Sequence, residues 1–431
     1  MRRTIFTGFV VTALALHVRA RAQDVRVTVD PGEVARRNVP VTAAIDDPAL
    51  AQQLRDARPD AKAITTLMPE GGASTVLAHL DAKPGQAVLL RWIEPELQPG
   101  KPKTYTLRPA TDGIDAPSFQ FKPGDGFRDL VRAGNGVYRH MTRFDAADHV
   151  NTFKTFHHVF ALDDSGTFIT NGPGSDEWGQ SGKDIRFPHH RGLFFAYNKT
   201  PYGDFWHGKD GVSQRHIYYD EMHEFAGPVA ARELGVLTWV AKDGKPVIRD
   251  ARRLSTWAVD RTMYVLDIDV TLESLTGDAI ALGGDAQHAG FHFRAANEVG
   301  QEPATKPTAG ATTRRGTGGG AATYTRPASA AGKGNDVWAD CPWVQCVFTV
   351  KGKPYAITQM NGPANAQPTV FSTRPYGRFG AFVNDQTVAP DKPLKFSYRF
   401  IIRDGSAAPD AKQLDAEYQD WITPAKVRFS K

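Results

Sequence analysis

Two stretches in which large apolar residues occupy every second position place the strongest constraint on the fold of this chain. They cover residues 264–272 and 394–403. Side chains of a β-strand point alternately to opposite faces of its sheet, so this alternation predicts antiparallel strands with two different faces. The sequence has no βαβ rhythm and no glycine-rich phosphate loop after a strand, which argues against a dinucleotide-binding fold. We therefore predict an all-β protein built around a large antiparallel β-sandwich.

The 431 residues divide into two predicted domains behind a short leader. Short apolar runs separated by proline and glycine turns fill residues 23–130 and predict a smaller, β-sandwich-like N-terminal domain. The stronger alternation lies in residues 131–431, which we assign to the large sandwich domain. Within this domain, residues 303–334 are rich in Gly, Ala and Thr and have almost no large apolar side chain. A mobile loop is expected there.

Two segments show helical features instead of alternation. Residues 48–57 form a helix-like insert within the N-terminal domain. Near the end of the chain, Leu414, Tyr418 and Trp421 follow Pro409 with the spacing of one helix face. We expect a short C-terminal helix that covers one face of the sheet.

The first 22 residues have the pattern of a secretory signal peptide. Arg2 and Arg3 precede an apolar run, and Ala20-Arg21-Ala22 resembles a cleavage site. The apolar run is too short to span a membrane. Removal of the four arginines of this segment lowers the formal net charge from +5 to +1, so charge gives no reason to expect nucleic-acid binding. We expect a periplasmic or secreted protein with no transmembrane segment in its mature chain.

The two cysteines are expected to be buried free thiols. Cys341 and Cys346 bracket the start of a predicted strand. Five residues of strand separate their Cα atoms by about 16 Å, which is too far for a disulfide.

Histidine placement gives the strongest indication of a functional site. Eleven of the 13 histidines lie between His140 and His292, and none follows in the sequence. Imidazole titrates near neutrality and binds metals, so such clustering indicates a catalytic or metal-binding site. The candidate catalytic residues are His189, His190, His216, Glu221, His288 and His292, and the candidate substrate-binding residues are Arg191, Trp206, Tyr218, Arg294 and Arg378.

Strand geometry limits how these residues can converge. On a strand through residues 288–294, His288 and His292 share one face with Arg294 and lie about 13 Å apart. Without a bulge they cannot bind one metal ion, but they can line opposite walls of a groove. In the extended segment 214–218, His216 and Tyr218 are expected on the same side.

Three functional interpretations stay open. The first is an enzyme that uses His and Glu side chains to transfer protons on a sugar-like substrate, by hydrolysis, elimination or epimerisation. The second is a carbohydrate-binding protein without catalysis. The third is a histidine-ligated metal protein or oxygenase, so a histidine-bound metal ion is the one cofactor left open. The expected partner is a small-molecule or oligosaccharide substrate.

Three motifs resemble the conserved blocks of the PmoA-like family of exported bacterial proteins. They lie at residues 187–194, 288–294 and 376–380, and the resemblance extends over about residues 130–425. It implies a supersandwich of the mutarotase type and a link to carbohydrate metabolism. The family takes its name from a membrane subunit of methane monooxygenase, which this chain does not resemble.

Overall fold

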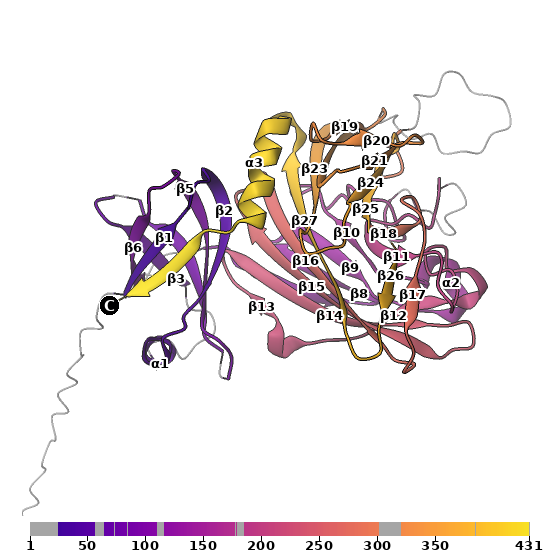
Figure 1. Ribbon diagram of the computed structural model, residues 1–431, viewed down its shortest axis with the longest axis horizontal. Coiled ribbons are helices and arrows are strands. Elements are labelled where there is room, and N and C mark those ends of the chain that lie inside the picture. Colours follow the sequence, from indigo (N-terminus) through magenta and orange to yellow (C-terminus); the bar gives the residue numbers. More distant parts are fainter. Residues whose placement is uncertain are drawn as a thin grey trace, which may run out of the picture.

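The computed structural model describes most of the chain after the predicted signal peptide. That segment and residues 303–319 of the predicted loop lie outside the described residues. Three large antiparallel sheets dominate the remainder, with a short helix near the C-terminus (Figure 1), so the predicted all-β class is confirmed. The described residues are 25–56, 64–72, 74–83, 85–109, 116–176, 178, 185–300, 320–383 and 385–430.

A seven-stranded sheet forms the N-terminal part and wraps around its own core. Buried side chains of β1 to β6, such as Val27 and Trp92, meet in one apolar cluster. Leu50 of helix α1 (Pro48–Asp56) belongs to the same cluster, and this helix is the helix-like insert predicted from the sequence. The C-terminal strand completes this sheet beside β1, and Figure 1 shows it in yellow against indigo. In sheet order the strands are β2 (Arg36–Ala44), β5 (Leu89–Leu97), β4 (Val76–Asp81), β3 (Ile64–Pro69), β6 (Lys103–Pro109), β1 (Val25–Asp30) and β28 (Lys426–Ser430).

A ten-stranded sheet forms one layer of the large sandwich. The chain passes from the first sheet to this one between β6 and β7; the domain boundary at residue 130 stays a prediction. In sheet order the strands are β20 (Ala331–Gly332), β21 (Val337–Ala339), β24 (Val370–Arg374), β25 (Arg378–Phe382), β18 (Ala289–Arg294), β11 (Leu193–Tyr197), β10 (Phe156–Val159), β9 (Asn135–Met141), β8 (Phe127–Arg132) and β7 (Phe119–Gly124).

A nine-stranded sheet forms the other layer. It contains both strands predicted from strict alternation, now β16 and β27, paired with each other. In sheet order the strands are β12 (Ser213–Tyr219), β14 (Ala230–Val240), β15 (Pro246–Ala258), β16 (Met263–Ser274), β27 (Leu394–Asp404), β23 (Lys353–Asn361), β22 (Trp343–Val350) and β19 (Thr323–Thr325), with β13 (Phe225–Ala226) beside β14. The remaining elements are the pair β17 (Ile280–Leu282) and β26 (Gln386–Val388), helices α2 (His149–Thr152) and α3 (Ala411–Ile422), and the 3₁₀ turns η1 (Ala146–Asp148), η2 (Lys209–Gly211), η3 (Glu221–His223) and η4 (Gly405–Ala407).

The two layers share one apolar core. Leu266 and Ile268 of β16 and Phe396 of β27 belong to the same buried cluster as Phe291 and Phe293 of β18. Because side chains alternate along β18, its other residues face away from this core. We call that side the outer face of the ten-stranded sheet, and it carries the candidate site.

Helix α3 covers the second face of β27, as the sequence predicts. Arg399, Ile401 and Arg403 share this face, and all three are buried because the helix packs over them. Arg403 pairs with Glu417, and Arg399 lies 5.3 Å from the ring centroid of Trp421. Among the described residues, no helix is long and apolar enough to cross a membrane.

Cys341 and Cys346 are free and buried, as expected. Burial raises the pKa of both thiols to about 12, so both are protonated and unreactive at neutral pH. Their role is to fill the core.

We predict that helix α3 depends on Leu414, which is fully buried against Ile401 and Trp343. Leu414→Ala should lower the free energy of unfolding by about 2–5 kcal/mol through lost burial and a residual cavity. Leu275→Ala is the matched control, because Leu275 is 48 % exposed and should change stability by less than about 0.5 kcal/mol. Urea denaturation measures both, and equal effects would contradict this account of the helix.

A second prediction concerns Asp420 of α3, which pairs with Arg36 of β2 at 3.3 Å. Burial raises the pKa of Asp420 to about 7, whereas an unfolded aspartate titrates near about 3.9. Between these values the folded state holds a proton that the unfolded state has lost, so the stability due to this group falls as pH rises.

Asp420→Asn cannot ionise and should therefore gain stability relative to the wild type as the pH increases from about 5 to about 8. Urea denaturation of both proteins at each pH measures this difference. A difference that stays constant with pH, or that shrinks, would show that the folded environment of Asp420 does not favour its protonated form.

Candidate active site

The outer face of the ten-stranded sheet is lined by aromatic rings and imidazoles. Phe194 of β11 and His292 of β18 point to this face, since their neighbours Phe195 and Phe291 lie in the shared core. Trp206, from the segment after β11, packs on both, with ring centroids 4.8 Å from Phe194 and 4.7 Å from His292. Trp206 is fully buried, so it supports the site from below and offers no exposed platform for a sugar.

Five histidines, which we call the imidazole cluster, gather around Trp206. The ring centroids of His189 and His190 are 4.2 Å apart, and His189 lies 4.5 Å from His207. His207 lies 5.4 Å from His288, which approaches Trp206 at 6.0 Å. Segments far apart in the sequence thus converge at one place. The members of the cluster are His189, His190, His207, His288 and His292.

Two members of the cluster are held by aspartates. Nδ1 of His207 lies 2.7 Å from Oδ2 of Asp204, and Nδ1 of His288 lies 3.0 Å from Oδ1 of Asp285. Burial disfavours the charge of Asp204, but hydrogen bonds from His207 outweigh it and lower the pKa of the carboxyl. The aspartates therefore stay ionised, accept the Nδ1 protons and leave both Nε2 atoms for other partners.

The interior of the cluster is kept uncharged. Burial, with the nearby Lys154, lowers the pKa of His189 to about 2, and burial lowers the pKa values of His190 and His292 well below the usual range. Burial also lowers the pKa of Lys154 well below its usual value, and its amine donates to the Trp206 carbonyl at 2.7 Å. Both ring nitrogens of His190 are buried without a hydrogen-bond partner among the described residues. A buried imidazole whose ring nitrogens have no hydrogen-bond partner can form hydrogen bonds with a ligand.

His292 depends on a glycine in the neighbouring strand. Gly380 of β25 lies opposite His292, and a Cβ there would be 2.2 Å from the imidazole. The guanidinium of Arg378 lies 3.3 Å from Nδ1 of His292 and donates to Gln287 at 3.0 Å and to Ser372 at 2.9 Å. Arg378 thus lies beside the cluster, and its expected role in substrate binding stays a prediction.

The turn that presents His189 and His190 has a strained backbone. Phe187 has a φ of +56°, a left-handed conformation that is unusual for a bulky side chain. Its carbonyl accepts a hydrogen bond from the His190 amide at 2.9 Å, and its ring lies 5.0 Å from that of Tyr376. Phe187 is 38 % exposed, so it offers the site an accessible aromatic surface.

Two other candidate arginines donate hydrogen bonds to backbone carbonyl groups of the protein itself. Arg191 is fully buried and donates to the carbonyl oxygens of Pro188 and Asn151, at 3.0 and 2.9 Å. Arg294 is also fully buried and donates to the Tyr376 carbonyl. Both hold the loops that surround the cluster.

Three candidate residues lie away from the cluster. His216 and Tyr218 are on β12, and Glu221 is in η3. A bulge between His216 and Tyr218 interrupts the expected alternation, so the expected placement of Tyr218 beside His216 is wrong. Tyr219 takes that place, with its ring 4.3 Å from His216, and Tyr218 is exposed.

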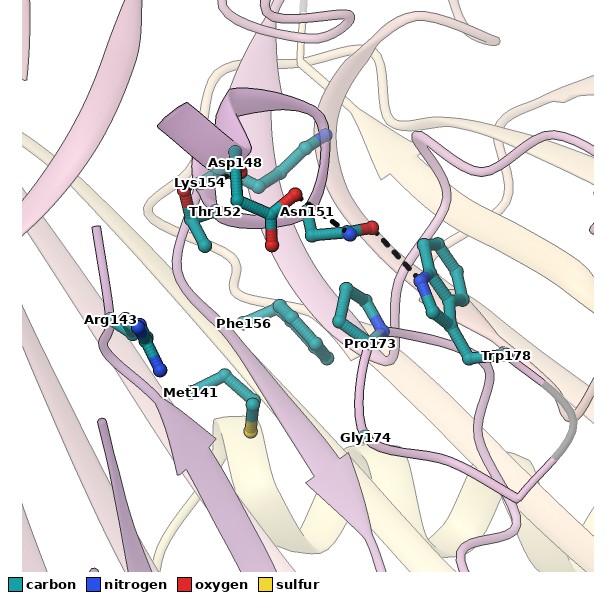
Figure 2. A pocket seen from close by; sticks show the side chains of 10 residues that line it. All are labelled: Met141, Arg143, Asp148, Asn151, Thr152, Lys154, Phe156, Pro173, Gly174 and Trp178. Carbon is teal, nitrogen blue, oxygen red and sulfur yellow. Dashed lines mark hydrogen bonds between the residues drawn. The ribbon is translucent and has the colours of Figure 1, made fainter. Parts of the chain in front are cut away.

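A cavity of about 280 Å³ also lies on the outer face, where Phe156 packs in one apolar cluster with Phe194 and Trp206. Figure 2 shows its apolar floor at Phe156 and a polar wall in which Asn151 donates to Asp148 and accepts from Trp178, both at 2.9 Å. Lys154 also lines the cavity, and its amine reaches the carbonyl beneath the cluster. Lys154 therefore connects this cavity with the segment of Trp206, whereas the residues that line the cavity include none of the five histidines.

Sequence reasoning did not select Lys154, His207, Asp204 or Asp285. Each aspartate precedes its histidine by three residues, and this Asp-x-x-His spacing is a signal that could have found both pairs. No local pattern marks Lys154, because its burial depends on segments distant in the sequence.

We predict that Gly380→Ala disrupts the cluster, since its methyl group would overlap the imidazole of His292. Overpacking of this kind costs about 1–3 kcal/mol of unfolding free energy. Gly332→Ala is the matched control on another strand of the sheet, where the nearest atom lies at an ordinary 3.4 Å. Thermal unfolding of both variants measures the difference, and an unchanged melting temperature for Gly380→Ala would refute the close approach.

Comparison with known proteins identifies a family but no activity. No curated protein matches the chain. A solved structure described as a putative kojibiose phosphorylase from human microbiome is 9 % identical, with a TM-score of 0.23, over 66 % of this chain and 35 % of that one. The present chain thus spans about a third of that protein, and a likeness this weak does not bear on function. The comparisons do not support the PmoA-like name. The model of DUF6807, a family of unknown function, matches residues 129–419, and the chain belongs to this family.

Proposed function

We propose that this protein is an exported enzyme that transfers protons on a carbohydrate-like substrate bound at the imidazole cluster. The observation that carries the proposal is the pairing of two aspartate-held imidazoles, His207 and His288, whose ring centroids lie 5.4 Å apart. One acts as general base and the other as general acid.

The geometry supports these roles through the orientation of each ring. An aspartate that accepts the Nδ1 proton fixes the tautomer and stabilises the imidazolium that forms when Nε2 takes a proton. The side chains of His207 and His288 are 23 % and 37 % exposed, so both are accessible to a ligand. Glu221, which the sequence analysis paired with the histidines, lies outside the cluster, and Asp204 and Asp285 assist the histidines in its place.

The surroundings favour a polar ring as substrate. The neutral imidazoles of His189 and His190 can donate or accept hydrogen bonds from hydroxyl groups. The accessible ring of Phe187 offers an apolar surface for the face of a sugar. Arg378 lies beside His292 and can orient a carbonyl or carboxylate group through charge-assisted hydrogen bonds. Hydrolysis, elimination and epimerisation can each use one general acid and one general base.

We predict that His207→Ala and His288→Ala each lower kcat/KM by about 10²–10⁴-fold, the usual contribution of a general acid or base. The assay follows a panel of mono- and disaccharides, uronic acids included, by proton NMR to detect any conversion by the wild type. His223→Ala is the matched control, because His223 is held by Asp220 at 2.9 Å with the same spacing but lies outside the cluster. It should leave the rate unchanged.

Two results would contradict the proposal. Binding of a sugar without conversion by the wild type would favour the alternative of a non-catalytic carbohydrate-binding protein. Conversion that survives in both His207→Ala and His288→Ala, while these variants remain folded, would place the chemistry elsewhere.

A further inference from the structure

A second group of polar side chains lies between the two sheets, on the inner side of the ten-stranded sheet. His140 of β9 and His157 of β10 meet Glu233 of β14, and His216 and Tyr219 of β12 stand beside them. We call these five residues the inter-sheet cluster. His140, His157 and Glu233 are each at most 3 % exposed. The cluster lies on the opposite side of the sheet from the imidazole cluster.

Three donor atoms of the inter-sheet cluster converge. Oε1 of Glu233 lies 2.9 Å from Nδ1 of His140 and 3.2 Å from Nε2 of His157. The two imidazoles stack at 4.1 Å with 17° between their planes. All three donor atoms lie within 4.8 Å of one another, so one ion at ordinary bond lengths of about 2.0–2.2 Å can reach each of them after small side-chain shifts.

Charge in this region favours a cation. Arg128 forms two hydrogen bonds with Glu224 and lies 3.1 Å from Oε2 of Glu233. This contact occupies one oxygen of Glu233 and directs the other, Oε1, to the imidazoles. Two buried carboxylates thus share one guanidinium, and a buried excess of negative charge is costly unless a cation compensates it.

Further ligands and an access route adjoin the three donors. The hydroxyl of Tyr219 lies 3.1 Å from Nδ1 of His140. The Nε2 atoms of His140 and His216 are buried without a hydrogen-bond partner among the described residues. A cavity of about 570 Å³ is lined by Arg128, Tyr219 and Glu221, so it opens directly beside the cluster. An ion, and a small ligand bound to it, could arrive by this route.

We propose that His140, His157 and Glu233 bind a divalent first-row transition-metal ion. Two imidazoles and one carboxylate form a donor set used for Zn²⁺ and for non-haem Fe²⁺, both of which leave positions for water or a ligand. A bound metal ion would replace the hydrogen bonds between the imidazoles and Glu233. Each imidazole would then stay neutral, with its single proton moved from the nitrogen that binds the metal to the other ring nitrogen. Nε2 of His140, buried and unpaired, becomes the protonated atom of that ring. The site is independent of the proposed proton-transfer site.

The test measures metal content in the full chain. Protein produced with zinc, iron or copper supplementation is passed through gel filtration and analysed by inductively coupled plasma mass spectrometry. We expect about one equivalent of one of these metals in the wild type and loss to background in His157→Gln and Glu233→Gln, whose amides are similar in size but poor ligands. His207→Ala and His223→Ala are the controls, one in the imidazole cluster and one outside both clusters, and both should retain the metal.

A measurement on the wild type keeps the test independent of how the buried variants fold. Cobalt-loaded wild type should show the intense visible absorption of four- or five-coordinate Co²⁺, and zinc should abolish it by displacement. Two outcomes would overturn the proposal. One is a wild type that retains none of these ions, cobalt included. The other is metal that persists in His157→Gln and Glu233→Gln but is lost in His207→Ala, which would assign binding to the imidazole cluster.

Discussion

The central strands of the ten-stranded sheet are buried on both faces, and this burial determines what the polar groups on them can do. Every residue of β10, β11 and β18 is buried, which is the pattern of strands covered on both sides. The nine-stranded sheet covers the inner face, and the segments that carry Trp206 and His190 cover the outer face. Polar groups on these strands therefore lie in a medium of low polarity, where charge is expensive unless it is paired.

This environment explains why the five histidines of the imidazole cluster differ in their proposed roles. His190 and His292 lie deepest and are held neutral, whereas His207 and His288 are more exposed and each carries an ionised aspartate partner. Neutral rings at depth can receive a ligand without the cost of burying extra charge. Protons can be exchanged at the accessible edge, where an aspartate stabilises the imidazolium. The proposed chemistry thus follows from the gradient of burial across the cluster.

The local part of this architecture could be read from the sequence. Alternation predicted β16 and β27 to within a few residues, and the shared face of His292 and Arg294 on β18, because side-chain direction in a strand is a local property. The candidate residues His189, His190, His288 and His292 do meet on one face.

Other features depend on tertiary contacts that no local pattern encodes. The bulge after His216 moved Tyr219 into the position expected for Tyr218. The meeting of His207 with His288 depends on two loops distant in the sequence, and the inter-sheet cluster is assembled from four strands of two sheets. The packing of sheets and loops decides such contacts. The sequence therefore indicates which residue types are present but does not indicate which of them meet.

Burial should keep the interior imidazoles of the cluster neutral and available to a ligand. Two-dimensional ¹H–¹⁵N NMR of histidine-labelled protein reads the protonation state of each ring directly, with assignment by single substitutions. We predict that His189, His190 and His292 show the chemical shifts of neutral imidazole throughout the range of about pH 5 to pH 8. Protonation of any of these three rings within that range would contradict it.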